Sequence, residues 1–264
     1  MFSVILTPSL VIGGLGLIFG ALLGYASIKF KVDKNENIDK VLEKLPGANC
    51  GGCGFTGCAS LAEAVVEHGE KVTRCNLVNE KQIREISDIL GIRAEKAVKR
   101  KAVVKCSGCK EKASDKYNPE GLDDCKIAFN LGGGPKECEF GCMGLGSCVR
   151  ACKFGAISIV NGIASVDREK CTGCGACAAE CPKNVISIEK EEQKTAVLCS
   201  STDKGAKVKL YCSAGCIGCM LCQKNCPNGA VTVTNNLASI NSDLCTNCGA
   251  CVKVCPKKVI SYSV

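Results

Sequence analysis

Cysteine is the residue type through which this chain could do chemistry, because 25 of its 264 residues are cysteines. Three runs share one spacing. In each, two residues separate successive members of a set of three cysteines, three residues separate the third from a fourth cysteine, and proline follows. These runs begin at Cys171, Cys216 and Cys245. In such a run the first three thiolates bind one four-iron, four-sulfide cube, and the fourth binds the neighbouring cube. The spacing therefore predicts several [4Fe-4S] clusters.

Two other uses of cysteine, disulfide frameworks and structural zinc, fit this spacing less well. Disulfide-rich small proteins are secreted, and the sequence shows no cleavable signal peptide with a small-residue cleavage site. Zinc sites usually combine two separated cysteine pairs, whereas these runs place three ligands on one loop. Iron–sulfur ligation requires a reducing compartment, so we expect the cysteine-rich part of the chain to face the cytoplasm.

The cysteine pattern is also duplicated. A shift of 74 residues superposes every cysteine of residues 125–181 on a cysteine of residues 199–255. Asn161-Gly162 and Asn235-Asn236 fall between short alternating segments in both copies, which indicates hairpin turns. Each copy resembles a bacterial two-cluster ferredoxin, in which the two cysteine runs exchange their last ligands.

The sequence predicts five ligand sets, the first a separate set near the N-terminus and the other four from this exchange. They are Cys50, Cys53, Cys58 and Cys75; Cys138, Cys142, Cys148 and Cys181; Cys152, Cys171, Cys174 and Cys177; Cys216, Cys219, Cys222 and Cys255; and Cys226, Cys245, Cys248 and Cys251. The set around Cys142 is irregular, because Leu145 occupies the position of Cys219 and Lys153 replaces the usual proline. Cys138 is the nearest substitute in the sequence.

Five cysteines remain outside these sets: Cys106, Cys109, Cys125, Cys199 and Cys212. One hypothesis is a sixth cluster held by Cys106, Cys109 and Cys125, with Cys199 or Cys212 as the fourth ligand. The alternative is that they are free buried thiols. Residues 103–107 and 196–200 resemble each other and are candidates for adjacent strands.

The N-terminal segment predicts a membrane anchor. No charged residue precedes Lys29, and residues 4–28 would extend about 37 Å as a helix, enough to cross a hydrocarbon layer of about 30 Å. Lys29, Lys31 and Lys34 follow at once, which favours a cytoplasmic location for the rest of the chain.

Three glycines of this segment, Gly16, Gly20 and Gly24, recur every four residues. In a membrane helix such a face allows another helix to approach closely. The predicted partner is a second copy of the chain or another membrane subunit.

The expected fold class is α+β. The predicted segments are a transmembrane anchor (1–28), a charged linker (29–45), a helical 4Fe-4S module (46–100), a connecting segment with a candidate extra cluster (101–135), and two-cluster ferredoxin domains at 136–195 and 196–264. Helices are expected over 60–69 and 80–90. His68, the single histidine, is expected to be solvated or to cap a helix, because four cysteines already complete the nearby set.

Composition narrows the function further. The formal charge of +8 is reversed by five or six clusters, which contribute roughly −10 to −12. With no tryptophan and four tyrosines, no basic patch interleaved with aromatics supports nucleic-acid binding. A glycine-rich nucleotide fingerprint after a strand and a P-loop are also missing, so we expect no catalytic residue and no nucleotide site in this chain.

The whole pattern resembles the B subunit of the Rnf complex: a glycine-rich anchor, the module of Cys50 to Cys75, and tandem ferredoxin units. Residues 133–142 resemble the clostridial version, and shorter family members lack the second ferredoxin unit. The resemblance implies a single-pass subunit of the inner (cell) membrane that receives electrons from soluble ferredoxin. It passes them to the membrane part of an ion-translocating ferredoxin:NAD+ oxidoreductase, with flavin-bearing subunits as partners and Na+ or H+ as the coupling ion.

Two alternatives remain open at this point. The chain could be a stand-alone, membrane-tethered polyferredoxin carrier, or a maturation or scaffold protein whose clusters are structural.

Overall fold

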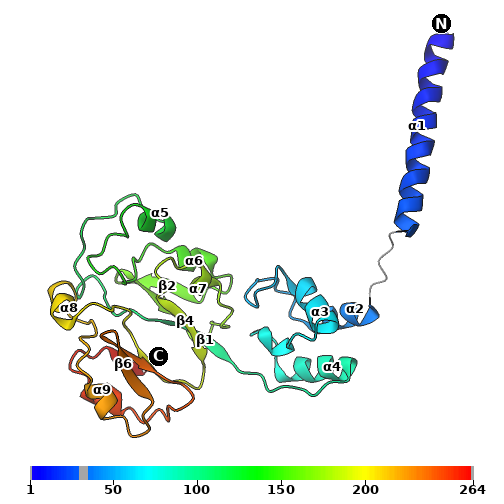
Figure 1. Cartoon of the computed structure of the whole chain (residues 1–264). Helices are drawn as coiled ribbons and strands as arrows, with labels where there is room; N and C mark the ends of the chain where they lie inside the picture. Colours follow the sequence, from blue (N-terminus) through cyan, green and yellow to red (C-terminus); the bar gives the residue numbers. More distant parts are fainter. Residues whose placement is uncertain (1, 30–34, 263–264) are drawn as a thin grey trace.

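The computed structural model describes residues 2–29 and 35–262 of the chain. Its elements, named as in Figure 1, are α1 (Phe2–Lys29), α2 (Glu36–Lys44), α3 (Cys58–Glu67), η1 (Val72–Arg74), α4 (Glu80–Leu90), β1 (Arg100–Val104), α5 (Cys125–Asn130), α6 (Ser147–Ala151), β2 (Ile157–Val160), β3 (Ile163–Val166), α7 (Ala176–Glu180), β4 (Ile186–Lys190), β5 (Thr195–Val197), α8 (Gly205–Tyr211), α9 (Leu221–Lys224), β6 (Val231–Thr234), β7 (Leu237–Ile240), α10 (Ala250–Val254) and β8 (Ile260–Tyr262).

The N-terminal helix α1 has 28 residues and covers residues 2–28 of the segment predicted as a membrane anchor. Among the residues whose placement is described, no helix combines the length and the apolar character needed to cross a bilayer. The anchor predicted over residues 1–28 is therefore not confirmed. Residue 1 of that segment and residues 30–34 of the predicted linker lie outside the described residues.

The predicted linker contains a helix that was not expected from the sequence. Asn35 caps α2 by accepting the N–H of Asn37 with its side chain. Val41 on α2 is fully buried, and Leu45 just after the helix is 5 % exposed. The charged residues of this segment lie on one face of an amphipathic helix, and its apolar face packs on the cluster module.

The cluster module has one apolar core shared by α2, α3 and α4. Leu61 on α3 and Ile86 on α4 are at most 1 % exposed. Helix α4 has the bounds predicted for it, begins with a capping box between Asn79 and Gln82, and ends at Gly91 in the left-handed conformation. His68 is exposed at the C-terminal cap of α3, as expected of a capping residue.

The two ferredoxin units repeat the same strand pairing. Each has an internal hairpin, β2 with β3 and β6 with β7, in equivalent registers. The hairpin turns use positive φ angles at Asn161, Asn235 and Asn236, as the turn residues predicted. Each unit has a second two-stranded sheet, β1 with β4 and β5 with β8.

These second sheets correct one expectation. The similar segments 103–107 and 196–200 are not adjacent strands, because β1 pairs with β4 of the first unit and β5 pairs with β8 of the second. The register is equivalent, since Val104 lies opposite Ile186 and Val197 lies opposite Ile260. The segments resemble each other because they fill the same place in the two copies. Strand β1 therefore belongs structurally to the first unit rather than to a separate connecting segment.

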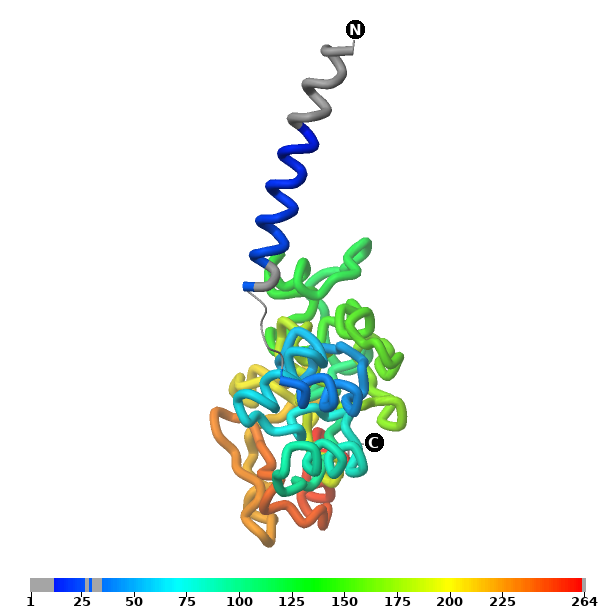
Figure 2. Tube along the Cα trace, turned by 90° about the vertical axis from the view of Figure 1, so that its right-hand side faces the viewer, coloured from blue at the N-terminus to red at the C-terminus, as the bar shows by residue number. Residues whose placement is uncertain are grey.

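The cluster module contacts the first ferredoxin unit through loops that carry cysteines. The Asn76 side chain donates to the backbone oxygen of Gly173 over 2.7 Å. A Cβ on Gly52 would lie only 1.9 Å from the backbone oxygen of Cys174. Only glycine fits this close approach of two cysteine-bearing loops. In Figure 2 the module lies in front of the ferredoxin units.

Candidate iron–sulfur sites

The first cysteine set lies around the start of α3. Cys58 is the first residue of that helix, and its N–H donates to the Asn49 side chain over 2.7 Å. Burial raises the pKa of the Cys75 thiol, backbone N–H groups oppose this, and the charges of Cys53 and Cys50 raise it further. Cys53 and Cys58 pack against the same core as Cys75. The four cysteines predicted as one ligand set therefore converge.

In the first ferredoxin unit, one ligand set gathers as the exchange of ligands predicts. The pKa of the buried Cys177 thiol is raised to about 12, first by burial and then by the charges of neighbouring cysteines. Those neighbours are Cys174, Cys171 and Cys152. Cys152 comes from the other run, so this part of the structure contains the expected crossover.

Both predicted sets of the second unit also gather. Burial raises the pKa of the Cys222 thiol to about 11. A backbone N–H lowers this pKa, and the charges of neighbouring cysteines raise it. These neighbours are Cys216, Cys219 and Cys255. Burial likewise raises the pKa of Cys251, followed by the charges of Cys245 and Cys226. Cys248 lies on the loop between Cys245 and Cys251.

The irregular set of the first unit differs from the prediction. Burial, followed by neighbouring cysteine charges, raises the pKa of the Cys148 thiol to about 12; the first three neighbours are Cys142, Cys125 and Cys181. The same four cysteines line one cavity, together with Leu145. Cys125, and not Cys138, therefore occupies the fourth position. Proximity in the sequence was misleading, because α5 brings Cys125 to the loop from 17 residues before Cys142.

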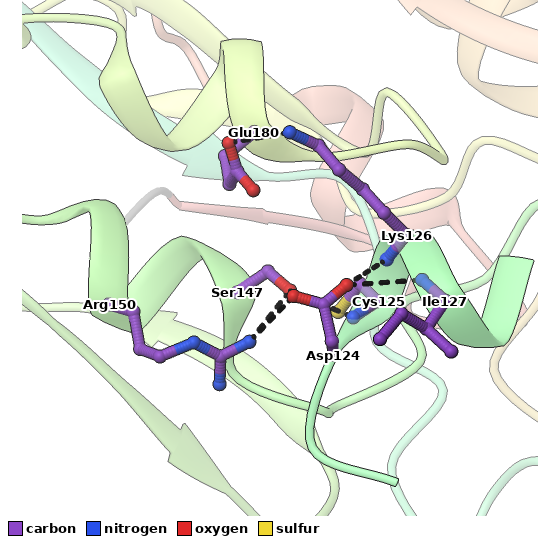
Figure 3. A network of polar contacts seen from close by, with 7 residues as sticks. All are labelled: Asp124, Cys125, Lys126, Ile127, Ser147, Arg150 and Glu180. Atoms are coloured by element: carbon purple, nitrogen blue, oxygen red, sulfur yellow. Dashed lines mark hydrogen bonds and ion pairs between the residues drawn. The ribbon is translucent and has the colours of Figure 1, made fainter.

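A polar network positions Cys125 at the start of α5 (Figure 3). The Cys125 N–H donates to the Ser147 hydroxyl over 2.8 Å. The Arg150 guanidinium donates to the Asp124 carboxylate over 3.0 Å, and that carboxylate also caps α5. The pKa of Asp124 is lowered, chiefly by a backbone N–H at the start of α5. Hydrogen bonds thus join the start of α5, which carries Cys125, to α6, which carries Cys148.

The displaced Cys138 joins another group. One cavity is lined by four cysteines: Cys106, Cys138, Cys199 and Cys212. Of the five cysteines outside the predicted sets, Cys125 therefore belongs to a set of the first unit. Three others line this cavity: Cys106, Cys199 and Cys212. Cys109 is buried and is not among the residues that line this cavity. The sixth set proposed from the sequence, with Cys106, Cys109 and Cys125 together, does not form.

Several sulfur atoms accept backbone N–H groups. The Sγ atoms of Cys171, Cys152 and Cys142 accept the N–H groups of three alanines at 3.3–3.4 Å. Those of Cys106 and Cys199 accept the N–H groups of two other cysteines, both at 3.4 Å. Such bonds favour the thiolate form and tune the reduction potential of a cluster.

The donor sets fit four-iron cubes chemically. Each predicted set is made of thiols alone, and cubes are held by four cysteine thiolates. Within the described ranges, no group of three or more cysteine, histidine or acidic side chains is placed to hold a single metal ion. A cube spreads its four ligands over four separate iron atoms. Because burial raises the pKa of the Cys148 and Cys177 thiols, cluster assembly must displace protons from them.

The fold and the cysteine sets define the class of protein: an iron–sulfur protein built from ferredoxin-type units. Residues 45–76 match a family described as "Putative Fe-S cluster", and residues 137–185, 170–230 and 215–259 match a "4Fe-4S dicluster domain".

Relatives that match along nearly the whole chain define the family. The B subunit of an ion-translocating oxidoreductase complex from Methanosarcina acetivorans is 45% identical over 98% of this chain and 99% of its own length. The B subunit of a Na+-translocating ferredoxin:NAD+ oxidoreductase complex from Acetobacterium woodii is 40% identical over 100% of this chain and 80% of its own length. The B subunit of a proton-translocating ferredoxin:NAD+ oxidoreductase complex from Clostridium ljungdahlii is 41% identical over 95% and 89%. The chain belongs to the family of B subunits of ion-translocating oxidoreductase (Rnf) complexes.

Proposed function

We propose that this chain is the iron–sulfur electron-transfer subunit that accepts electrons from reduced ferredoxin for an ion-translocating ferredoxin:NAD+ oxidoreductase complex. The observation that carries the proposal is the series of cysteine sets, with the cluster module in direct contact with the first ferredoxin unit. Clusters in such a series exchange single electrons, and cubane potentials reach low enough for ferredoxin. Flavin and nicotinamide chemistry then belongs to other subunits.

We also propose that residues 1–28 tether the chain to the membrane, with the cluster-bearing part on the cytoplasmic side. Ile12, Leu17 and Leu23 on α1 are 70–78 % exposed. A Cβ on Gly16 or Gly20 would meet no atom within 4 Å, so this face of the helix is open to a partner helix. Apolar exposure on this scale favours lipid or another helix over water.

The membrane assignment predicts co-purification. After gentle solubilisation, a tagged chain is expected to bring the other subunits of the complex with it, as identified by mass spectrometry. Changing Gly16 and Gly20 together to leucine should weaken this association without altering the iron content, because bulky side chains block close helix approach. Isolation of the wild-type chain alone from intact membranes would instead favour a stand-alone carrier.

The proposed electron route predicts a second result. Cys50→Ala combined with Cys53→Ala is expected to remove about four irons per chain from the cluster module, because two ligands cannot hold a three-iron remnant. The ferredoxin units should still be reduced by ferredoxin in rapid mixing, because the module lies between them and the membrane helix in the proposed route. Electron delivery to the membrane subunits should be lost. Loss of reduction in the ferredoxin units as well would contradict this order. Unreactive clusters in the wild-type chain would favour a structural scaffold.

A further inference from the structure

Four cysteines outside the ferredoxin ligand sets line one cavity between the two ferredoxin units: Cys106, Cys138, Cys199 and Cys212. This bridging site is similar in size to the cavities around Cys148 and Cys222. We propose that it holds a sixth [4Fe-4S] cluster, which joins the two units. This inference rests on the proposed function, because it requires the chain to carry clusters.

Each ferredoxin unit contributes an equivalent pair of cysteines to the bridging site. Cys138 and Cys212 are related by the 74-residue repeat. Cys106 and Cys199 each follow a strand in the same place, since the preceding residue donates its N–H to Val185 O over 2.6 Å in one unit and to Val259 O over 2.7 Å in the other. The site therefore lies where two like surfaces meet, with two ligands from each.

Reciprocal hydrogen bonds hold the two surfaces together beside these cysteines. The Ser107 hydroxyl donates to Leu198 O over 3.3 Å, and the Ser200 hydroxyl donates to Lys105 O over 3.0 Å. Each bond joins the residue after one cysteine to the residue before the other. This arrangement fixes the separation of Cys106 and Cys199 without filling the cavity between them.

The sulfur atoms themselves border a common space. The Sγ atoms of Cys106 and Cys212 each lie 3.6 Å from the position that a Cβ on Gly108 would occupy. Glycine leaves this position empty between two sulfurs contributed by different units.

A buried positive charge points to an anionic occupant. Lys136 lines the cavity and is 4 % exposed. Its ammonium donates to the backbone oxygens of Gly108 and Gly162, and it takes part in no ion pair found among the described residues. A buried ammonium is stabilised when a negative charge lies beside it. A cube with four thiolates carries roughly −2 and would supply such a charge.

The bridging site touches one cluster set of each unit. The N–H of Cys142 donates to the Cys106 sulfur, and the N–H of Cys216 donates to the Cys199 sulfur, both over 3.4 Å. Cys142 and Cys216 are themselves members of the neighbouring sets. A cluster here would make the six sites a continuous series: the module, the two clusters of the first unit, the bridge, and the two clusters of the second unit.

The test is the iron, sulfide and zinc content of the full chain purified without oxygen. The wild-type chain should hold about 24 irons, and Cys138→Ala combined with Cys212→Ala should hold about 20. This double variant removes two of the four proposed ligands, one from each unit. A three-iron remnant needs three ligands, so it cannot form. Cys109→Ala is the matched control, because it removes a buried cysteine of the same segment that lies outside the cavity, and it should keep about 24.

Several results would overturn the bridging cluster. About 20 irons in the wild-type chain, with or without one zinc, would show that the site holds no cube, while leaving the other clusters and the proposed function intact. Unchanged iron in the double variant would show that these cysteines are not ligands. An iron-free wild-type chain would overturn the proposed function itself. If the double variant loses the spectroscopic signals of the other clusters as well, the test is repeated with Cys106→Ala combined with Cys199→Ala. That variant must lose about four irons.

Discussion

Replacing Cys125 by alanine is expected to destroy one cluster of the first ferredoxin unit, although this residue lies outside the regular cysteine run. Its sulfur lines the same cavity as Cys142, Cys148 and Cys181. Combining Cys125→Ala with Cys148→Ala should remove about four irons in total, because both residues serve one cube. The measurement is the iron and sulfide content of protein purified without oxygen, together with electron paramagnetic resonance of the reduced clusters.

The matched comparison uses Cys138, which is closer to Cys142 in the sequence. Combining Cys138→Ala with Cys148→Ala should change the paramagnetic signals of two clusters, because these residues serve different cubes, and each of those cubes keeps three ligands for a three-iron remnant. If the results were reversed, with two clusters changed by the pair containing Cys125 and one cluster lost with the pair containing Cys138, the regular order of the sequence would be right and the arrangement of α5 would be wrong.

Replacing Gly52 by alanine is expected to interrupt electron flow without removing a cluster. A Cβ at this position would lie 1.9 Å from the backbone oxygen of Cys174, and backbone atoms cannot move aside as a flexible side chain can. The module must therefore shift away from the first ferredoxin unit, at a cost of about 1–3 kcal/mol to this contact. We expect unchanged iron content and a roughly 5- to 150-fold slower passage of electrons between the module and the unit, the factor that corresponds to this cost.

Gly69→Ala is the control for this change. Gly69 belongs to the same module and adopts a positive φ, but an added Cβ would meet no atom within 4 Å. It should therefore strain the module slightly and leave the transfer rate unchanged. Equal rates in Gly52→Ala and the wild-type chain, measured by rapid mixing with reduced ferredoxin, would show that electrons do not cross at this contact.

The regular cysteine sets and the hairpins follow from local chemistry. Three thiols two residues apart must share one loop, and the fourth is fixed by the pairing of two runs within each copy. Asn161 and Asn235 adopt the positive φ angles that tight hairpins require. Helix α4 is likewise encoded locally, by its capping box and by Gly91. These elements could be predicted because the residues that determine them are neighbours in the sequence.

Helix α2 was missed for the opposite reason. Its nine residues are dominated by charge, and a linker was therefore expected in their place. The helix is stabilised by burying Val41 against α3 and α4, a contact with residues that follow it by 20 or more positions. Tertiary packing overrides weak local propensity in such a segment.

The amino-acid sequence by itself determined that this chain is a duplicated ferredoxin with a separate cluster module, because cluster ligation imposes spacings that few other structures need. Only the tertiary structure decided which partners Cys125 and Cys138 have, and that Cys106 and Cys199 meet between the units. Those groupings depend on where α5 and the two second sheets carry the chain. Long-range packing sets that position, and no spacing along the sequence encodes it.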